Sequence, residues 1–200
     1  MQFKYPHDRV VFFSDAVFAI AITLLVIEIK IPTHEQIHEL GMGGVLSKLI
    51  PLFVAFLISF LVTALFWRWH LIVMHYVKNI DNRLLWLNVW LLLFVALLPF
   101  SSGFYSENFG SNWPFFLYCI DLALVGLFTY SITAYVIRKE NLEETLGKKQ
   151  AQWMRLRALI TPIVFLSCIP LAMLSPLVGR MGFLLIFVFQ FIGARYYRNK

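Results

Sequence analysis

Six long apolar runs alternate with short polar segments along the 200 residues of the chain. The first covers residues 9–32, and its apolar part, residues 10–27, spans about 27 Å as a helix. The others cover residues 46–76, 84–100, 113–137, 158–174 and 177–197. A helix of about 20 apolar residues crosses a hydrocarbon core. The pattern therefore predicts an all-α, polytopic membrane protein with six transmembrane helices in one domain, residues 1–200.

Prolines set several of the predicted helix ends. The first helix stops at Pro32, because proline lacks a backbone donor and cannot continue it. Residues 33–48 are expected to form a polar loop or a short surface helix. Pro99 closes the third helix, and residues 101–112 form a loop rich in Ser, Gly and Asn. Pro162 and Pro170 are expected to kink the fifth helix rather than to create a site.

Composition and charge agree with a membrane protein. Apolar residues make up 60% of the chain and aromatic residues 17%, more than a soluble domain can cover with polar surface. The net charge of +6 does not indicate nucleic acid, because the basic residues lie in short loops and at the ends of apolar runs. One side of the predicted membrane has only Lys30, Lys48 and Arg180. The other side has Lys4, Arg9, Lys78, Arg83, Arg138, Lys139, Lys148, Lys149, Arg155, Arg157, Arg195, Arg198 and Lys200. The positive-inside rule therefore places both termini in the cytoplasm.

The sequence offers little for catalysis or metal binding. Cys119 and Cys168 both lie inside apolar runs without metal-like spacing, so they are interpreted as small core residues. No nucleophile elbow or metal-ligand set is present. We therefore expect neither an enzyme nor a bound cofactor.

Polar side chains inside the membrane are the candidate chemistry. A carboxylate within the first run costs roughly 2.5 kcal/mol or more, so Asp15 needs a partner or a function. Asp15 lies about 9 Å inside Arg9, and His70 lies about 9 Å inside Tyr76 on an antiparallel neighbour. Trp67 lies near the same level. These depths predict a network in which Trp67 and His70 support Asp15.

The first helix also has a distinct apolar face. At 100° per residue, Ile20, Thr23, Leu24 and Ile27 share one side, and Asp15 points to roughly the opposite side. Six helices without a large polar face do not enclose an aqueous pore, so a conduction path is expected on a symmetry axis between subunits. From periodicity alone, this face lines such a path, faces lipid or packs in the core.

A motif at the start of this helix narrows the choice. Arg9, Phe13, Ser14 and Asp15 form Arg-x-x-x-Phe-Ser-Asp, followed by AVFAIAITLLVIEIKIP. This stretch closely resembles the transmembrane protein 175 family, the endosomal and lysosomal potassium channels and their bacterial relatives. The resemblance implies a single-repeat member in the bacterial inner (plasma) membrane, assembled as a homotetramer with helix 1 lining a central pore. Arg9 is either an interface anchor or a structural partner of Asp15 or of a neighbouring helix.

The resemblance also implies roles for the apolar face. Ile20 and Ile27 are expected to form apolar rings at the constriction, and Thr23 to supply the hydroxyl that contributes to potassium selectivity. Leu24 lies at the edge of this face. Glu28, at the outer end, either draws cations to the mouth or is a solvated helix end.

These observations lead to two functional hypotheses. The first is a potassium-selective or potassium-permeable cation channel, with a hydrophobic constriction and without a Thr-Val-Gly-Tyr-Gly filter. Its partners are membrane lipid, permeant potassium and three further copies of the chain. The alternative is a proton channel or proton-coupled transporter with Asp15, His70 and Asp121 as relays. A structural hydrogen-bond role for Asp121 competes with a role as an ion site.

Overall fold

The computed structural model describes residues 5–182, 184–186, 188–189, 192 and 195. The regular structure of this part of the chain is helical, apart from one antiparallel bridge between Tyr5 and Ile80. Its elements are α1 (His7–Leu24), the 3₁₀ helix η1 (Leu25–Glu28), α2 (His34–His75), α3 (Asn82–Glu107), α4 (Asn112–Lys139), α5 (Leu142–Thr145), α6 (Lys148–Leu174) and α7 (Pro176–Met181).

Five helical segments are long and apolar enough to cross a membrane: His7–Glu28, His34–His75, Asn82–Glu107, Asn112–Lys139 and Lys148–Leu174. The predicted all-helical membrane architecture is therefore confirmed. For the sixth predicted helix, residues 177–197, the structure describes the first turns as α7, and residues 183, 187, 190–191, 193–194 and 196–197 lie outside the described residues. The count of six and the location of the termini stay predictions.

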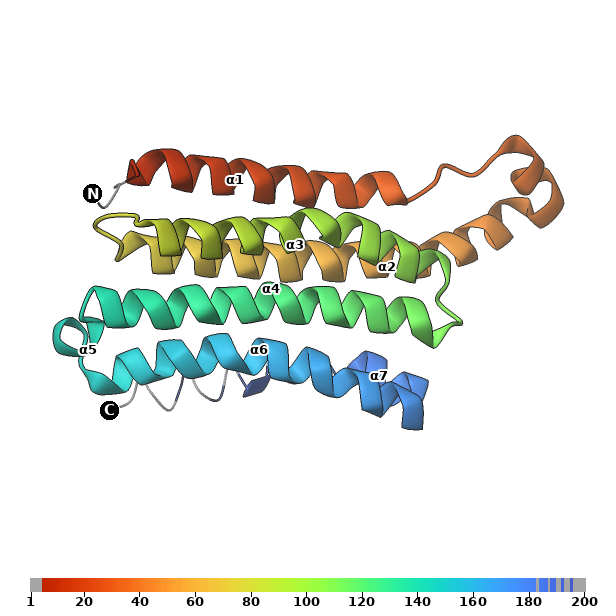
Figure 1. Cartoon of the computed structure of the whole chain (residues 1–200). Coiled ribbons are helices and arrows are strands. Elements are labelled where there is room, and N and C mark those ends of the chain that lie inside the picture. The colour runs from red at the N-terminus through yellow and green to blue at the C-terminus, as the bar shows by residue number, and fades with distance from the viewer. Residues whose placement is uncertain (1–4, 183, 187, 190–191, 193–194, 196–200) are drawn as a thin grey trace.

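The long helices lie side by side with alternating directions (Figure 1). Helix α3 contacts α1 and α4, and α4 contacts α6 on its other side. The start of α1, the α2–α3 turn and the α4–α5–α6 connection share one end of the bundle (Figure 1). The first turns of α2 extend past the other end (Figure 1). By the distribution of Lys and Arg, the first of these ends is the predicted cytoplasmic one.

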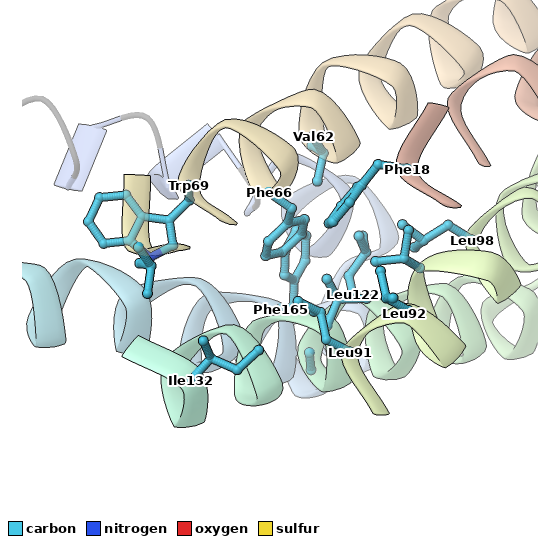
Figure 2. Packing of buried hydrophobic residues seen from close by; sticks show 14 of the residues in the cluster. Phe18, Val62, Phe66, Trp69, Leu91, Leu92, Leu98, Leu122, Ile132 and Phe165 are labelled. Atoms are coloured by element: carbon cyan, nitrogen blue, oxygen red, sulfur yellow. The ribbon is translucent and has the colours of Figure 1, made fainter. Parts of the chain in front are cut away.

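The core is apolar and draws on every long helix. Phe18, Phe66, Leu91, Leu122 and Phe165, one each from α1, α2, α3, α4 and α6, are all buried (Figure 2). Lipid tails are as apolar as these side chains, so close packing rather than burial from water holds the helices together.

The predicted end of the first helix at Pro32 is wrong, because the α-helical part of α1 ends at Leu24 and one 3₁₀ turn, Leu25–Glu28, follows. Of the two forms expected for residues 33–48, the loop is wrong. Helix α2 begins at His34 behind a capping box between Thr33 and Gln36, and its first turns form the short surface helix. The helix changes direction at Gly41, where φ is 65° and ψ is 165°, a conformation open to glycine.

Two further boundaries are also wrong. Pro99 does not close α3, which continues to Glu107, so part of the predicted 101–112 loop is helical. Proline removes only its own hydrogen bond to the preceding turn, and the serines that follow find partners inside the bundle. Helix α6 begins at Lys148, ten residues before the predicted start at 158, directly after Gly147 with its φ of 87°.

Asp81 closes the α2–α3 turn. Its Oδ1 accepts the backbone N–H of Leu84 at 2.9 Å and so caps α3. Its Oδ2 accepts the hydroxyl of Tyr135 at 2.5 Å and lies 3.3 Å from Nζ of Lys139. Burial by itself raises the pKa of Asp81, but the hydrogen bonds from Tyr135, Leu84 and Lys139 and the charge of Lys139 outweigh it. The pKa is therefore lowered, and α4 is tied to this turn through a charged carboxylate.

Candidate functional site

Helix α1 has one buried and one exposed face. Ser14, Phe18 and Ala21 are buried against the other helices, and Leu25 in η1 continues the same line. This spacing of three to four residues keeps one side of a helix towards its neighbours. No described residue of the chain covers the opposite face, which is therefore available to lipid or to another subunit.

The four side chains predicted to line a pore all lie on the exposed face. Ile20 is 58% exposed and Ile27 69% exposed, and Thr23 and Leu24 are exposed beside them. Of the alternatives that periodicity leaves open, packing in the core of the subunit is therefore wrong for these residues. Phe13 of the motif lies on the same side and is exposed as well.

The Thr23 hydroxyl is oriented by its own helix. Its Oγ1 lies 3.0 Å from the carbonyl oxygen of Ala19 and 2.9 Å from that of Ile20, so its single proton points back to the backbone. A hydroxyl oxygen that donates in this way keeps lone pairs for a further interaction. Thr23 thus offers an oxygen ligand in the middle of an otherwise apolar stripe.

Behind the stripe, Asp15 has a donor from the neighbouring helix. Nε1 of Trp67 in α2 donates a hydrogen bond of 2.9 Å to Oδ1 of Asp15. The contact between Trp67 and Asp15, which were predicted to lie at the same depth in the membrane, is therefore present. An indole N–H has no acceptor function, so the pair has a defined direction and ties α1 to α2.

His70 and Ser14 are connected through a third residue. Nε2 of His70 lies 2.8 Å from Oδ1 of Asn88, and Nδ2 of Asn88 donates to Oγ of Ser14 at 2.8 Å. Ser14 in turn donates to the carbonyl oxygen of Val10 at 2.8 Å. The amide oxygen of Asn88 can only accept, so Nε2 of His70 carries the proton. His70 therefore binds Asn88 rather than Asp15.

Asn88 is the functional residue that the depth argument missed. His70, Asn88 and Ser14 are all almost completely buried, with Asn88 between α1 and α2 on α3. A lone amide near the start of an apolar helix was the available signal, since a buried amide has to find partners. The polar network behind the stripe consists of Ser14, Asp15, Trp67, His70 and Asn88.

Arg9 does not join this network. Its side chain is exposed, and the structure shows it in no ion pair or hydrogen bond with any residue that is described. The described part of the single chain therefore shows no pairing of Arg9 with Asp15 or with a neighbouring helix, and both roles considered for Arg9 stay predictions. The position at the start of α1 fits an anchor at the membrane interface.

A second polar cluster lies closer to the outer end. Ser101 donates to Oδ2 of Asp121 at 2.6 Å. Ser59 lies 2.7 Å from the Ser102 hydroxyl and 2.9 Å from that of Tyr118. Asp121 is 6% exposed, and its Oδ1 has no hydrogen-bond partner among the residues described. The cluster connects α2, α3 and α4 away from the exposed stripe.

The described ranges hold no group of three or more His, Cys, Asp or Glu side chains placed to bind a metal ion. Cys119 and Cys168 are buried free thiols. The chemistry of the site is therefore that of an apolar stripe with one hydroxyl, fixed from behind by hydrogen bonds. These features define a multi-pass helical membrane protein. One face of its N-terminal helix is exposed to lipid or to another subunit instead of packing in the core of the chain.

Comparison with known proteins gives matches to one family of channels. A family model described as endosomal/lysosomal potassium channel TMEM175 matches residues 9–99. A protein of Chamaesiphon minutus named potassium channel is 39% identical over 99 residues, 50% of this chain and 49% of that protein. The endosomal/lysosomal proton channel TMEM175 of Gallus gallus is 27% identical over 181 residues, 81% of this chain and 36% of its own length.

A solved structure agrees with these matches. The crystal structure of a lysosomal potassium-selective channel TMEM175 homolog from Chamaesiphon minutus has a TM-score of 0.77 and 26% sequence identity, and the match covers 94% of this chain and 97% of that one. The aligned region spans about half or less of the two curated relatives. Residues 9–99 thus match the TMEM175 family, as the motif from Arg9 to Asp15 implied, and the solved structure agrees in fold over most of the chain.

Proposed function

We propose that this chain is a subunit of a potassium-permeable cation channel that assembles as a homotetramer in a bacterial inner membrane. The observation that carries the proposal is the exposed stripe of Ile20, Thr23, Leu24 and Ile27 on α1 and η1, which begins five residues after Asp15 of the polar network and faces away from it. Relatives in the same family are named potassium channels. Four copies of the stripe around a symmetry axis would form a central path.

Such a path is narrow and apolar. Rings of Ile20 and Ile27 lie about 10 Å apart along the helix, at 1.5 Å per residue. An apolar ring offers an ion no ligand and closes by losing its water. A small widening admits a partly hydrated cation, and the outward oxygen of Thr23, halfway between the rings, replaces part of its water. Leu24 lies at the edge of the stripe and narrows the path from the side.

The polar network gives α1 a fixed rotation. One helical turn holds two separate links, from Asp15 to Trp67 and from Ser14 to Asn88. A helix that is apolar almost all round has no other reason to prefer one face towards the axis. We infer that these links position Ile20 and Thr23 and take no part in conduction themselves.

The test is a flux measurement on the reconstituted protein. Purified protein in liposomes should give reversal potentials that follow the potassium gradient, with smaller shifts under sodium and proton gradients. Protein-free liposomes are the control. Reversal potentials that ignore potassium would overturn the proposal.

A second candidate is proton permeation, because vertebrate relatives such as the Gallus gallus protein are named proton channels. The relays would be Asp15, His70 and Asp121. The hydrogen-bonded links among the described residues end at Val10 on one side and at Asp121 on the other, without a contact between them. A reversal potential that follows only the proton gradient in the same liposomes would favour this candidate.

A further inference from the structure

The outer end of the stripe is fastened to α3 at one glycine. Glu28, the last residue of η1, lies across the buried backbone of Gly103. A Cβ at Gly103 would overlap Oε2 of Glu28 and lie 2.6 Å from its Cδ and 2.8 Å from its Cγ. Atoms do not approach so closely without displacement. The carboxylate side chain therefore occupies the space that any other residue at position 103 would need.

An ion pair lies one helical turn further along α3. Lys30 pairs with Glu107, and their side chains are 80% and 42% exposed. The hydrogen bond with Glu107, then its charge, raises the pKa of Lys30, and the charge of Glu28 adds to the effect. Exposed pairs of this kind contribute little to stability. The packing of Glu28 on Gly103 and the buried side chain of Leu25 therefore hold this end more than the ion pair does.

The charges around Glu28 do not suit a cation-attracting mouth. An open hollow of about 510 Å³ borders η1 and α3, and its lining includes Glu28, Glu107, Lys30 and Lys48. Two carboxylates and two ammonium groups leave no net charge. Of the two roles considered for Glu28, drawing cations to the mouth is therefore not supported, since its carboxylate is directed towards α3.

We propose that Glu28 and Gly103 are positioning residues for conduction: their contact sets where Ile27 lies in the outer apolar ring. Ile27 and Glu28 are neighbours in a single 3₁₀ turn, and buried Leu25 holds the other side of that turn. A shift of the Glu28 backbone would therefore move Ile27, whereas a rotation of the Glu28 side chain alone would not. This inference rests on the proposed function, because it assumes that Ile27 borders the ion path.

Gly103→Ala is the first variant. Alanine favours a helix more than glycine does, so a defect cannot come from a weakened α3. We expect the single-channel conductance in planar bilayers to differ from that of the wild type, because a shifted Ile27 changes the width of the outer apolar ring. Single-channel conductance does not depend on how much protein folds, so it separates positioning from a loss of stability.

Rescue identifies the contact. Glu28→Ala removes the side chain that the new Cβ displaces, so Glu28→Ala/Gly103→Ala should conduct like Glu28→Ala alone. Gly110→Ala is the matched control, because a Cβ there meets nothing within 4 Å. Wild-type conductance in Gly103→Ala, or a double variant as altered as Gly103→Ala, would overturn the proposal.

Thermal unfolding separates this inference from the proposed function. If the wild-type protein conducts no cations, the proposed function fails and the role of Glu28 and Gly103 in conduction fails with it. The contact itself is still measured, because Gly103→Ala should lower the unfolding temperature and the double variant should restore it to that of Glu28→Ala. Conducting wild-type channels that are insensitive to Gly103→Ala would refute only the positioning role.

Discussion

His70 of α2 and Asn88 of α3 form a 2.8 Å hydrogen bond in the buried centre of the bundle. Asn88 also donates to Ser14 of α1, so α2 and α1 are connected through a side chain of α3. The amide oxygen of Asn88 accepts from His70, and its amide nitrogen donates to Ser14. A buried amide that makes only one of these two hydrogen bonds destabilises the folded state. The rotation of α1 therefore depends on α3.

Asn88→Leu should destabilise the protein by about 1–3 kcal/mol, because it leaves the N–H of His70 and the oxygen of Ser14 buried without a partner. The measurement is the free energy of unfolding in detergent. Trp67→Phe is the comparison, since its hydrogen bond to Asp15 is half-exposed and should cost less than about 1 kcal/mol. Equal stability of Asn88→Leu and the wild type would contradict the network.

Ile20→Asn should raise the single-channel conductance, because an amide ring holds water where an isoleucine ring expels it. Val26→Asn is the matched control. Val26 is exposed on the same helical segment but lies outside the stripe. Equal effects of the two substitutions, or none from Ile20→Asn, would place the constriction elsewhere.

Thr23→Ala should reduce the preference for potassium over sodium, because it removes the only hydroxyl on the stripe. Thr23→Ser keeps the oxygen and its hydrogen bond to the backbone, so its permeability ratio should stay close to that of the wild type. Bi-ionic reversal potentials in liposomes measure the ratio. An unchanged ratio in Thr23→Ala would show that selectivity arises at another position.

Asp121→Asn should leave both stability and potassium flux close to wild type, because the amide oxygen still accepts from Ser101 and no charge is buried. Asp121→Ala should lower the unfolding temperature, since Ser101 loses its short bond to the carboxylate and keeps only the 3.2 Å contact with the carbonyl oxygen of Leu98. The same two variants separate the candidate functions. If Asp121→Asn abolishes proton flux in an intact protein, Asp121 acts as a relay.

Acid should loosen the α2–α3 turn through Asp81. Because the folded pKa of Asp81 is lowered, its contribution to stability is complete above about pH 4, the ordinary range of an aspartate. That contribution is lost as the pH falls through the folded pKa. The unfolding temperature of the wild type should therefore drop below pH 4 more steeply than that of Asp81→Asn. Parallel pH curves for the two proteins would exclude this role.

The apolar runs were sufficient to predict the long helices, because these follow from length and composition. Periodicity left open whether the stripe is exposed or packs in the core, and the resemblance to a family favoured exposure. The depths of the residues along their helices correctly predicted the contact between Trp67 and Asp15. Depth gives the level of a side chain in the membrane but not the direction in which it points. The hydrogen bond from His70 to Asn88 was therefore missed. The error at Pro99 has a similar cause. Local propensity indicated a loop, whereas the buried partners of the following serines keep the chain helical.

Residues 101–103 of α3 contact α4, α2 and η1 in turn, each through one side chain or backbone site. Inserting or deleting a single residue between them and Asn88 would rotate the later part of α3 by about 100°. All three contacts would then be lost together while those of Asn88 remained. The number of residues between Asn88 and Ser101 therefore determines whether α3 can reach α1, α2, α4 and η1 at the same time.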